Sequence, residues 1–156
     1  MTRTPPPAPT PVHSPAYPRV RRTVLRSWRT LTVPVPADAR EVLGLLRKLV
    51  VVNLLDWGVD PGRAEDIELA LSELVTNALL HSGGPALVKV KMRSGAVQLE
   101  VSDTGTRPAH PADATLDGER GRGLHIVKTL AYATSMRIHG WGKTIVASFD
   151  AAFERR

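Results

Sequence analysis

The chain contains no cysteine among its 156 residues, so it has neither a disulfide framework nor a cysteine-based metal site. It also lacks any run of about 18 apolar residues, the length that a membrane-spanning helix requires. The N-terminus has no apolar segment of the kind found in secretory signals. These absences predict a soluble cytoplasmic protein, and the length predicts one domain with a real core.

Acidic residues are absent from the first 29 positions, which hold six arginines. The other 15 basic residues balance the 15 acidic ones, so the net charge of +6 belongs to the N-terminal arm. Duplex-binding proteins typically carry such an excess on a folded surface, and neither a recognition helix nor an aromatic stacking platform is recognisable. Seven of the first 18 residues are proline. We therefore predict a disordered Pro/Arg-rich tail over residues 1–28, a flexible or docking arm with no direct nucleic-acid contact.

The folded part begins with a strand and a helix. Alternating β-branched residues predict a strand near 29–35, and Pro34 and Pro36 place it at a sheet edge or end it. A helix follows, for which Asp38 is the predicted N-cap and Gly58 the predicted stop. The apolar residues that fit its helical period are Val42, Leu45, Leu46, Leu49, Val52 and Leu55.

A second helix starts at Asp60 and Pro61, ends at Gly83–Gly84, and carries a core stripe of Ile67, Leu71, Leu74 and Ala78. After it the sequence predicts a hairpin around Ser94–Gly95, a loop over 104–120, a short helix opening with glycines, and a last hairpin of 136–138 and 144–149. This order predicts an α+β fold. We expect a two-layer sandwich, in which about three helices cover one face of a mixed, mostly antiparallel sheet.

Polar residues form a row on the second helix. Glu73, Asn77 and His81 are four residues apart and so share one helix face, while the other side is apolar. Asp103 ends an alternating strand, and Gly105 lets another group approach the backbone there. Taken singly, these patterns also fit a solvated helix face and an ordinary Asp–Gly turn.

The segment GRGL opens the third helix with Gly121, Arg122, Gly123 and Leu124. Free amide groups and the positive dipole end at a helix start favour an anion, and the glycines leave room for a phosphate. Arg120 and Arg122 flank this start and are suited to pair with phosphate oxygens. A flexible hinge is the alternative interpretation. No GxxxxGK[ST] run is present, so the segment is not a P-loop.

In order along the chain, ELVTNALLH, DTG, GRGL and GKT resemble the nucleotide-binding motifs of the histidine-kinase-like (GHKL, Bergerat-fold) ATPases. The chain looks most like the small stand-alone anti-sigma factor serine/threonine kinases in that family. The resemblance implies an ATPase domain over 29–152, a C-terminal tail over 153–156, and ATP and Mg²⁺ as ligands.

The resemblance also implies roles for the residues. Glu73 would be the general base on a hydroxyl or water, and Asn77 would help to hold Mg²⁺ between the phosphates. Asp103 would accept a hydrogen bond from the adenine amino group, with Gly105 beside it. For His81 we favour a structural role.

The remaining motifs carry further implied contacts. Thr144 would support the adenine site, and Gly121 and Gly123 would cradle the phosphates. Arg120 or Arg122 would stabilise the γ-phosphate.

The function implied is that of a kinase that sequesters a sigma factor and phosphorylates a STAS-like anti-sigma factor antagonist. Small relatives often pair through the first strand and helix, which implies a possible homodimer. Arg107 stands where the family often has a second glycine, and the loop 106–120 is short. These departures favour an alternative, an ATP-gated protein-binding module without kinase turnover. Autophosphorylation on histidine is not expected, because His13 lies in the proline-rich tail.

Overall fold

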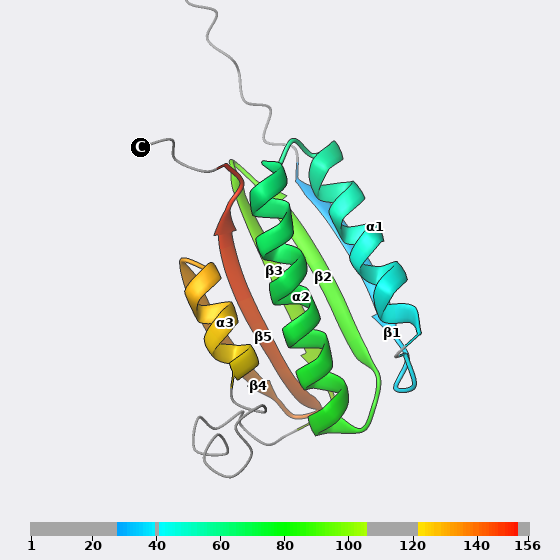
Figure 1. Cartoon of the computed structure of the whole chain (residues 1–156). Coiled ribbons are helices and arrows are strands. Elements are labelled where there is room, and N and C mark those ends of the chain that lie inside the picture. The colour runs from blue at the N-terminus through cyan, green and yellow to red at the C-terminus, as the bar shows by residue number, and fades with distance from the viewer. Residues whose placement is uncertain (1–27, 40, 106–121, 153–156) are drawn as a thin grey trace, which may run out of the picture.

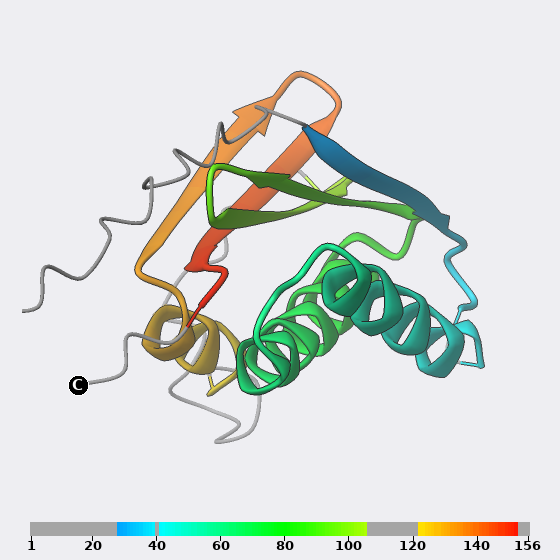
Figure 2. The same ribbon diagram turned by 90° about the horizontal axis from the view of Figure 1, so that it is seen from above.

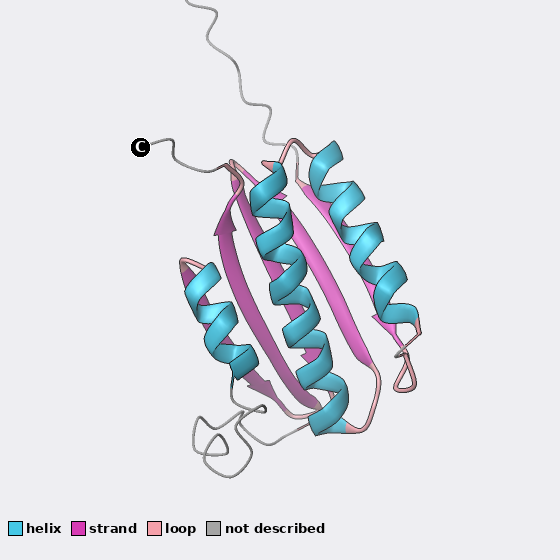
Figure 3. Ribbon diagram, viewed as in Figure 1, coloured by secondary structure: helices cyan, strands magenta, loops and turns pink. Residues whose placement is uncertain are grey.

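The computed structural model describes residues 28–39, 41–105 and 122–152. One sheet forms the first layer, and the helices form a second layer on one of its faces (Figures 1 and 2). The elements are β1 Arg29–Val35, α1 Val42–Asp56, α2 Pro61–Ser82, β2 Ala86–Arg93, β3 Ala96–Asp103, α3 Arg122–Leu130, β4 Ala133–His139 and β5 Gly142–Asp150. The predicted α+β sandwich with three helices over one sheet is confirmed (Figure 3).

The sheet has the strand order β1-β2-β3-β5-β4, and all neighbouring pairs of described strands are antiparallel. It is thus more uniform than the mixed sheet that we predicted. β1 is an edge strand, as Pro34 predicted, because a proline has no amide hydrogen to offer to a second neighbour. Asp103 of β3 lies opposite Ala86 of β2 and Lys143 of β5, so three strands meet at the same end of the sheet.

α2 is the central helix, and its limits follow from its sequence. Asp60 caps it, since Oδ1 accepts hydrogen bonds from the amides of Gly62 at 3.0 Å and Arg63 at 3.4 Å. Gly83 ends it in the left-handed conformation, with φ of 63°. The predicted stripe is buried, along with neighbouring side chains: Ala64, Ile67, Ala70, Leu71, Leu74, Val75 and Ala78. This packing fixes the rotation of α2 about its axis, and with it the direction of the polar row.

α1 forms where a helix was predicted, but the predicted N-cap at Asp38 is wrong. The helix begins at Val42 after Glu41, and no side chain caps it. Asp38 lies instead in the turn that precedes the helix. Gly58 follows the end of the helix, as predicted.

The buried face of α1 consists of Leu46, Val50 and Leu54. Of the residues that fit the predicted helical period, only Leu46 is therefore buried. The other five are exposed: Val42, Leu45, Leu49, Val52 and Leu55. Apolar residues occur on several sides of α1, so the period alone did not identify the side that packs against α2 and the sheet.

The two hairpins also form. Ser94 and Gly95 turn the chain between β2 and β3 with φ of 52° and 83°, the positive values that a tight two-residue hairpin turn requires. The last hairpin is longer than predicted, because β4 already begins at Ala133. No helix in the described part of the chain is long and apolar enough to cross a membrane.

Candidate functional site

The predicted site residues that the structure describes gather at one end of the two layers, where β3 ends and α3 begins (Figure 1). The C-terminal half of α2 lies beside both points. A Cβ built on Gly105, just after β3, would come within 3.4 Å of Ser82 in the last turn of α2. A Cβ built on Gly123, in the first turn of α3, would overlap the carboxylate of Glu73. Two separate motifs therefore lie against the C-terminal half of α2, which carries the third.

Asp103 is held in a fixed position at the end of β3. Its side chain is 2% exposed, and Oδ1 accepts a hydrogen bond from the amide of Gly105 at 2.7 Å. Lys143 Nζ lies 3.3 Å from the same oxygen, and its side chain is also 2% exposed. A buried charge is stable only when paired, so these two side chains form one unit.

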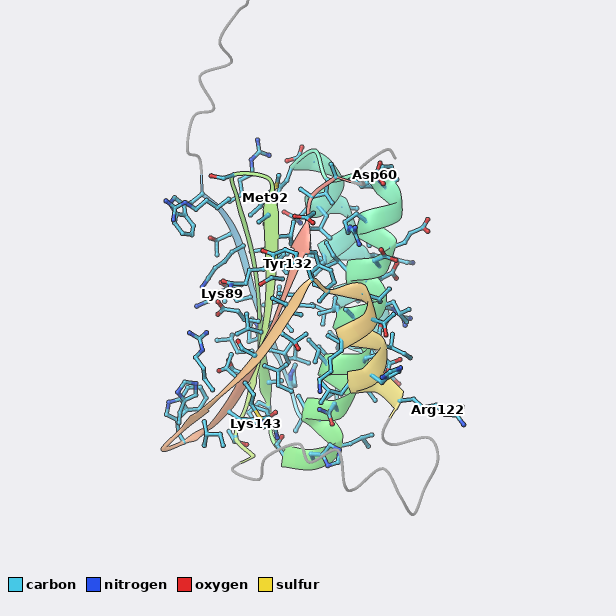
Figure 4. All side chains as sticks on the ribbon, turned by 90° about the vertical axis from the view of Figure 1, so that its left-hand side faces the viewer. Asp60, Lys89, Met92, Arg122, Tyr132 and Lys143 are labelled. Carbon is cyan, nitrogen blue, oxygen red and sulfur yellow. The ribbon has the colours of Figure 1, made fainter. Side chains whose placement is uncertain are left out.

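Lys143 was not among the site residues that the sequence motifs predicted. A signal was present, because side chains alternate along a strand and Ile145, Ala147 and Phe149 of β5 are core residues. This alternation places Lys143 on the core side of the sheet, the side of Asp103 (Figure 4). Lys143 thus lies beside the Asp103 carboxylate. The resemblance had implied that Thr144 would support this part of the site.

The structure does not bring the Thr144 side chain to Asp103. Its hydroxyl lies 2.8 Å from Ser102 Oγ and 3.0 Å from His139 Nε2, on the sheet face that the helices leave uncovered. The His139 ring stacks on Trp141 at a centroid distance of 5.1 Å. Thr144 is therefore part of a polar network on the face of the sheet opposite the Asp103 side chain.

The polar row of α2 faces the start of α3 at Glu73. A Cβ at Gly123 would overlap its carboxylate, so a side chain fits there only if the Glu73 side chain moves aside. Asn77 is half-buried one turn further on, and His81 is exposed at the end of the helix. The row therefore runs from a carboxylate held against a helix start to a solvent-exposed imidazole.

The GRGL motif is described only from its second residue. Arg122 begins α3, is exposed, and points away from the sheet (Figure 4). Leu124 is partly buried and packs against the core. Arg120 and Gly121 lie outside the described residues, as does Arg107.

A family model for the histidine kinase-like ATPase domain matches residues 35–149, which is most of the chain. The chain belongs to this ATPase family. The family predicted from the four motifs is therefore confirmed. No curated protein matches the chain by sequence.

Two solved structures resemble the ATPase domain in fold. The RsbU and RsbW domains of Rv1364c from Mycobacterium tuberculosis superpose with a TM-score of 0.61 at 20% identity. The match covers 78% of this chain and 32% of that one, so the chain spans about a third of this relative. The SiaB–SiaC complex from Pseudomonas aeruginosa gives a TM-score of 0.59 at 16% identity, covering 76% and 88%. Sequence identities this low show only that this chain and the two structures share a fold.

The site of this ATPase domain has the chemistry that an adenine nucleotide needs. The missing side chains at Gly105 and Gly123 let the backbone lie close to the carboxylates of Asp103 and Glu73. Asp103 is an acceptor suited to an amino group, and Asn77 provides the neutral oxygen that suits Mg²⁺. No group of three or more His, Asp or Glu residues in the described ranges is placed to hold a metal ion.

Proposed function

We propose that this domain binds ATP with Mg²⁺ and transfers the γ-phosphoryl group to a serine or threonine of a protein antagonist. The observation that carries the proposal is the contact between Glu73 and Gly123 at the start of α3, with Asn77 one turn away. A helix start attracts phosphate, and a carboxylate beside it is placed to take a proton from an attacking hydroxyl. This arrangement supports a kinase better than a passive nucleotide-binding protein.

In this proposal each residue has one task. Asp103 accepts the hydrogen bond of the adenine amino group, and Gly105 keeps the approach to it open. Asn77 would help to hold Mg²⁺, and a metal there would supply the positive charge that phosphoryl transfer needs. Glu73 orients and deprotonates the hydroxyl.

The phosphates would be held by the start of α3. We propose that Gly121 and Gly123 present backbone amides to them, and that Arg120 or Arg122 pairs with the γ-phosphate. The ATPase domain would comprise residues 29–152, with the segments 1–28 and 153–156 as tails.

The partners that we propose are a sigma factor, which the domain sequesters, and a STAS-like antagonist, which it phosphorylates. The similarity to the RsbW-containing structure and to SiaB in its complex with SiaC supports a regulator that acts through protein partners. A regulator of this kind would work in the cytoplasm. Its activity would control how much sigma factor is free to act in transcription.

We also propose a homodimer through α1 and the edge strand β1. The exposed residues Val42, Leu45, Leu49 and Val52 follow the three–four spacing of a helix-pairing seam. An apolar patch of this kind on a soluble domain typically marks an interface. β1 has no neighbour on its outer side among the described strands, and Figure 2 shows α1 and β1 at the same side of the two layers.

The experiment measures transfer from γ-labelled ATP to STAS-domain proteins of the source genome. Glu73→Gln should lower the rate by about 10²- to 10⁴-fold, the usual contribution of a general base, while ATP binding persists. Glu68→Gln is the matched control, because Glu68 is on the same helix but pairs with Arg47 at 3.8 Å. It should transfer at the rate of the unmodified protein.

Equal transfer by the Glu73 and Glu68 variants would remove Glu73 from the role of base. ATP-dependent stabilisation without any phosphoprotein after long incubation would favour the ATP-gated binding module instead. No thermal shift with ATP and Mg²⁺ would contradict both functions.

A further inference from the structure

Lys143 is a lysine in a core position. Its side chain is 2% exposed and lies on the same side of β5 as the buried Ile145 and Ala147. Lysine is almost never fully buried unless it is paired, because its ammonium loses its hydration there. The cost of burying it requires a compensating interaction at this position.

The compensating partner is Asp103, which faces Lys143 directly across β3 and β5. Nζ lies 3.3 Å from Oδ1, and the Gly105 amide donates to the same Oδ1 at 2.7 Å. The second oxygen, Oδ2, accepts no hydrogen bond from the described residues. The ammonium of the ion pair and the Gly105 amide therefore both lie at Oδ1, which leaves Oδ2 available.

We propose that Lys143 is a positioning residue that determines nucleobase choice through Asp103. This inference rests on the proposed ATP function and adds a residue to it. With Oδ1 held by Lys143 and Gly105, the carboxylate keeps one orientation and presents Oδ2 as an acceptor. An acceptor in that place pairs with the amino group of adenine and repels the carbonyl oxygen of guanine.

Removing the ammonium should release this orientation. A buried carboxylate without its cation turns toward water or toward any other donor, because an uncompensated charge is costly there. Oδ2 then no longer lies where the base requires it. The effect should fall on the recognition of adenine and much less on the binding of the triphosphate.

The experiment titrates ATP and GTP, each with Mg²⁺, into the protein by calorimetry. Lys143→Met removes the charge at similar length and should weaken ATP binding by roughly 10- to 100-fold, the value of a hydrogen bond to a charged group. GTP binding should change little, so the preference for ATP collapses. Lys143→Arg keeps the charge and should recover part of the preference.

Lys91→Met is the matched control. Lys91 also forms an ion pair, with Nζ 2.6 Å from Glu100 Oε1, but on the uncovered face of the sheet. It should leave the affinity for both nucleotides unchanged. This control shows whether a loss of ATP affinity is specific to the Lys143–Asp103 pair or follows from removing any ion pair in the sheet.

A double variant tests the inference if the Lys143→Met protein does not fold. The double variant Asp103→Asn/Lys143→Met leaves neither charge unpaired. If Lys143 acts through Asp103, the double variant binds ATP no more weakly than Asp103→Asn alone. Losses that add up would overturn the proposal.

The remaining outcomes are distinguishable. A folded Lys143→Met protein that keeps the affinity and the ATP preference of the unmodified chain overturns this inference alone. An unmodified chain that binds no nucleotide contradicts the proposed function, and the inference fails with it.

Discussion

Two adjacent leucines of α1 should differ sharply in their contribution to stability. Leu46 is 2% exposed and packs in the core, whereas Leu45 is 67% exposed. Leu46→Ala removes buried apolar atoms and leaves a cavity, which costs about 3 kcal/mol in the free energy of unfolding. For a domain of this size that loss lowers Tm by roughly 6–12 °C. Leu45→Ala should change the unfolding free energy of the monomer by less than about 0.5 kcal/mol.

Chemical denaturation followed by far-UV circular dichroism measures both losses, at a dilution where the protein is monomeric. The same pair tests the proposed dimer. Leu45→Ala should shift the monomer–dimer equilibrium toward the monomer in analytical ultracentrifugation, while the unfolding free energy of the monomer stays unchanged. Equal destabilisation by Leu45→Ala and Leu46→Ala in the monomer would refute the reasoning, because α1 would then bury the face that the structure exposes.

Two further predictions concern single positions. Gly123→Ala should push the Glu73 carboxylate aside and lower the rate of phosphoryl transfer by about 10²-fold. The free energy of unfolding should change by less than about 1 kcal/mol, because the flexible Glu73 side chain can move. Transfer assays and thermal melts measure the two effects, and an unchanged transfer rate would contradict the role of Glu73 as base. Asp60→Ala should cost about 1 kcal/mol by removing the α2 cap at the end of the molecule away from the site. Urea titration measures that loss, and ATP affinity should not change.

The sequence predicted the fold well where local signals and packing agree. Asp60 and Gly83 are strong helix-end signals, and all four residues of the predicted α2 stripe are buried. The pattern of α1 was less informative, since Leu45 and Leu46 are chemically alike and only tertiary packing distinguishes them. The sequence pattern therefore predicted that α1 is a helix but did not determine which of its faces is buried.

The candidate site was predicted in part for a related reason. The motifs gave Glu73, Asn77 and Asp103, and the structure places these residues on elements that meet at one end of the molecule. The motif GKT directed attention to Thr144, although strand alternation assigns the core side to Lys143. A motif identifies the residue types that recur in a family. The alternation of side chains along a strand shows which of these residues lie on the same face of the sheet.

The ends of the described chain lie far from Asp103. Arg29 pairs with Met92 near the β2–β3 turn, and Asp150 pairs with Ala96 beside the same turn. Figure 1 shows this turn at the pole of the molecule opposite the start of α3. A fluorophore or a tether to a sensor chip, attached at residue 28 or 152 where the described chain ends, would therefore be anchored at the distal pole. A protein tethered at either of these positions would keep the pole that carries Asp103 directed away from the attachment point.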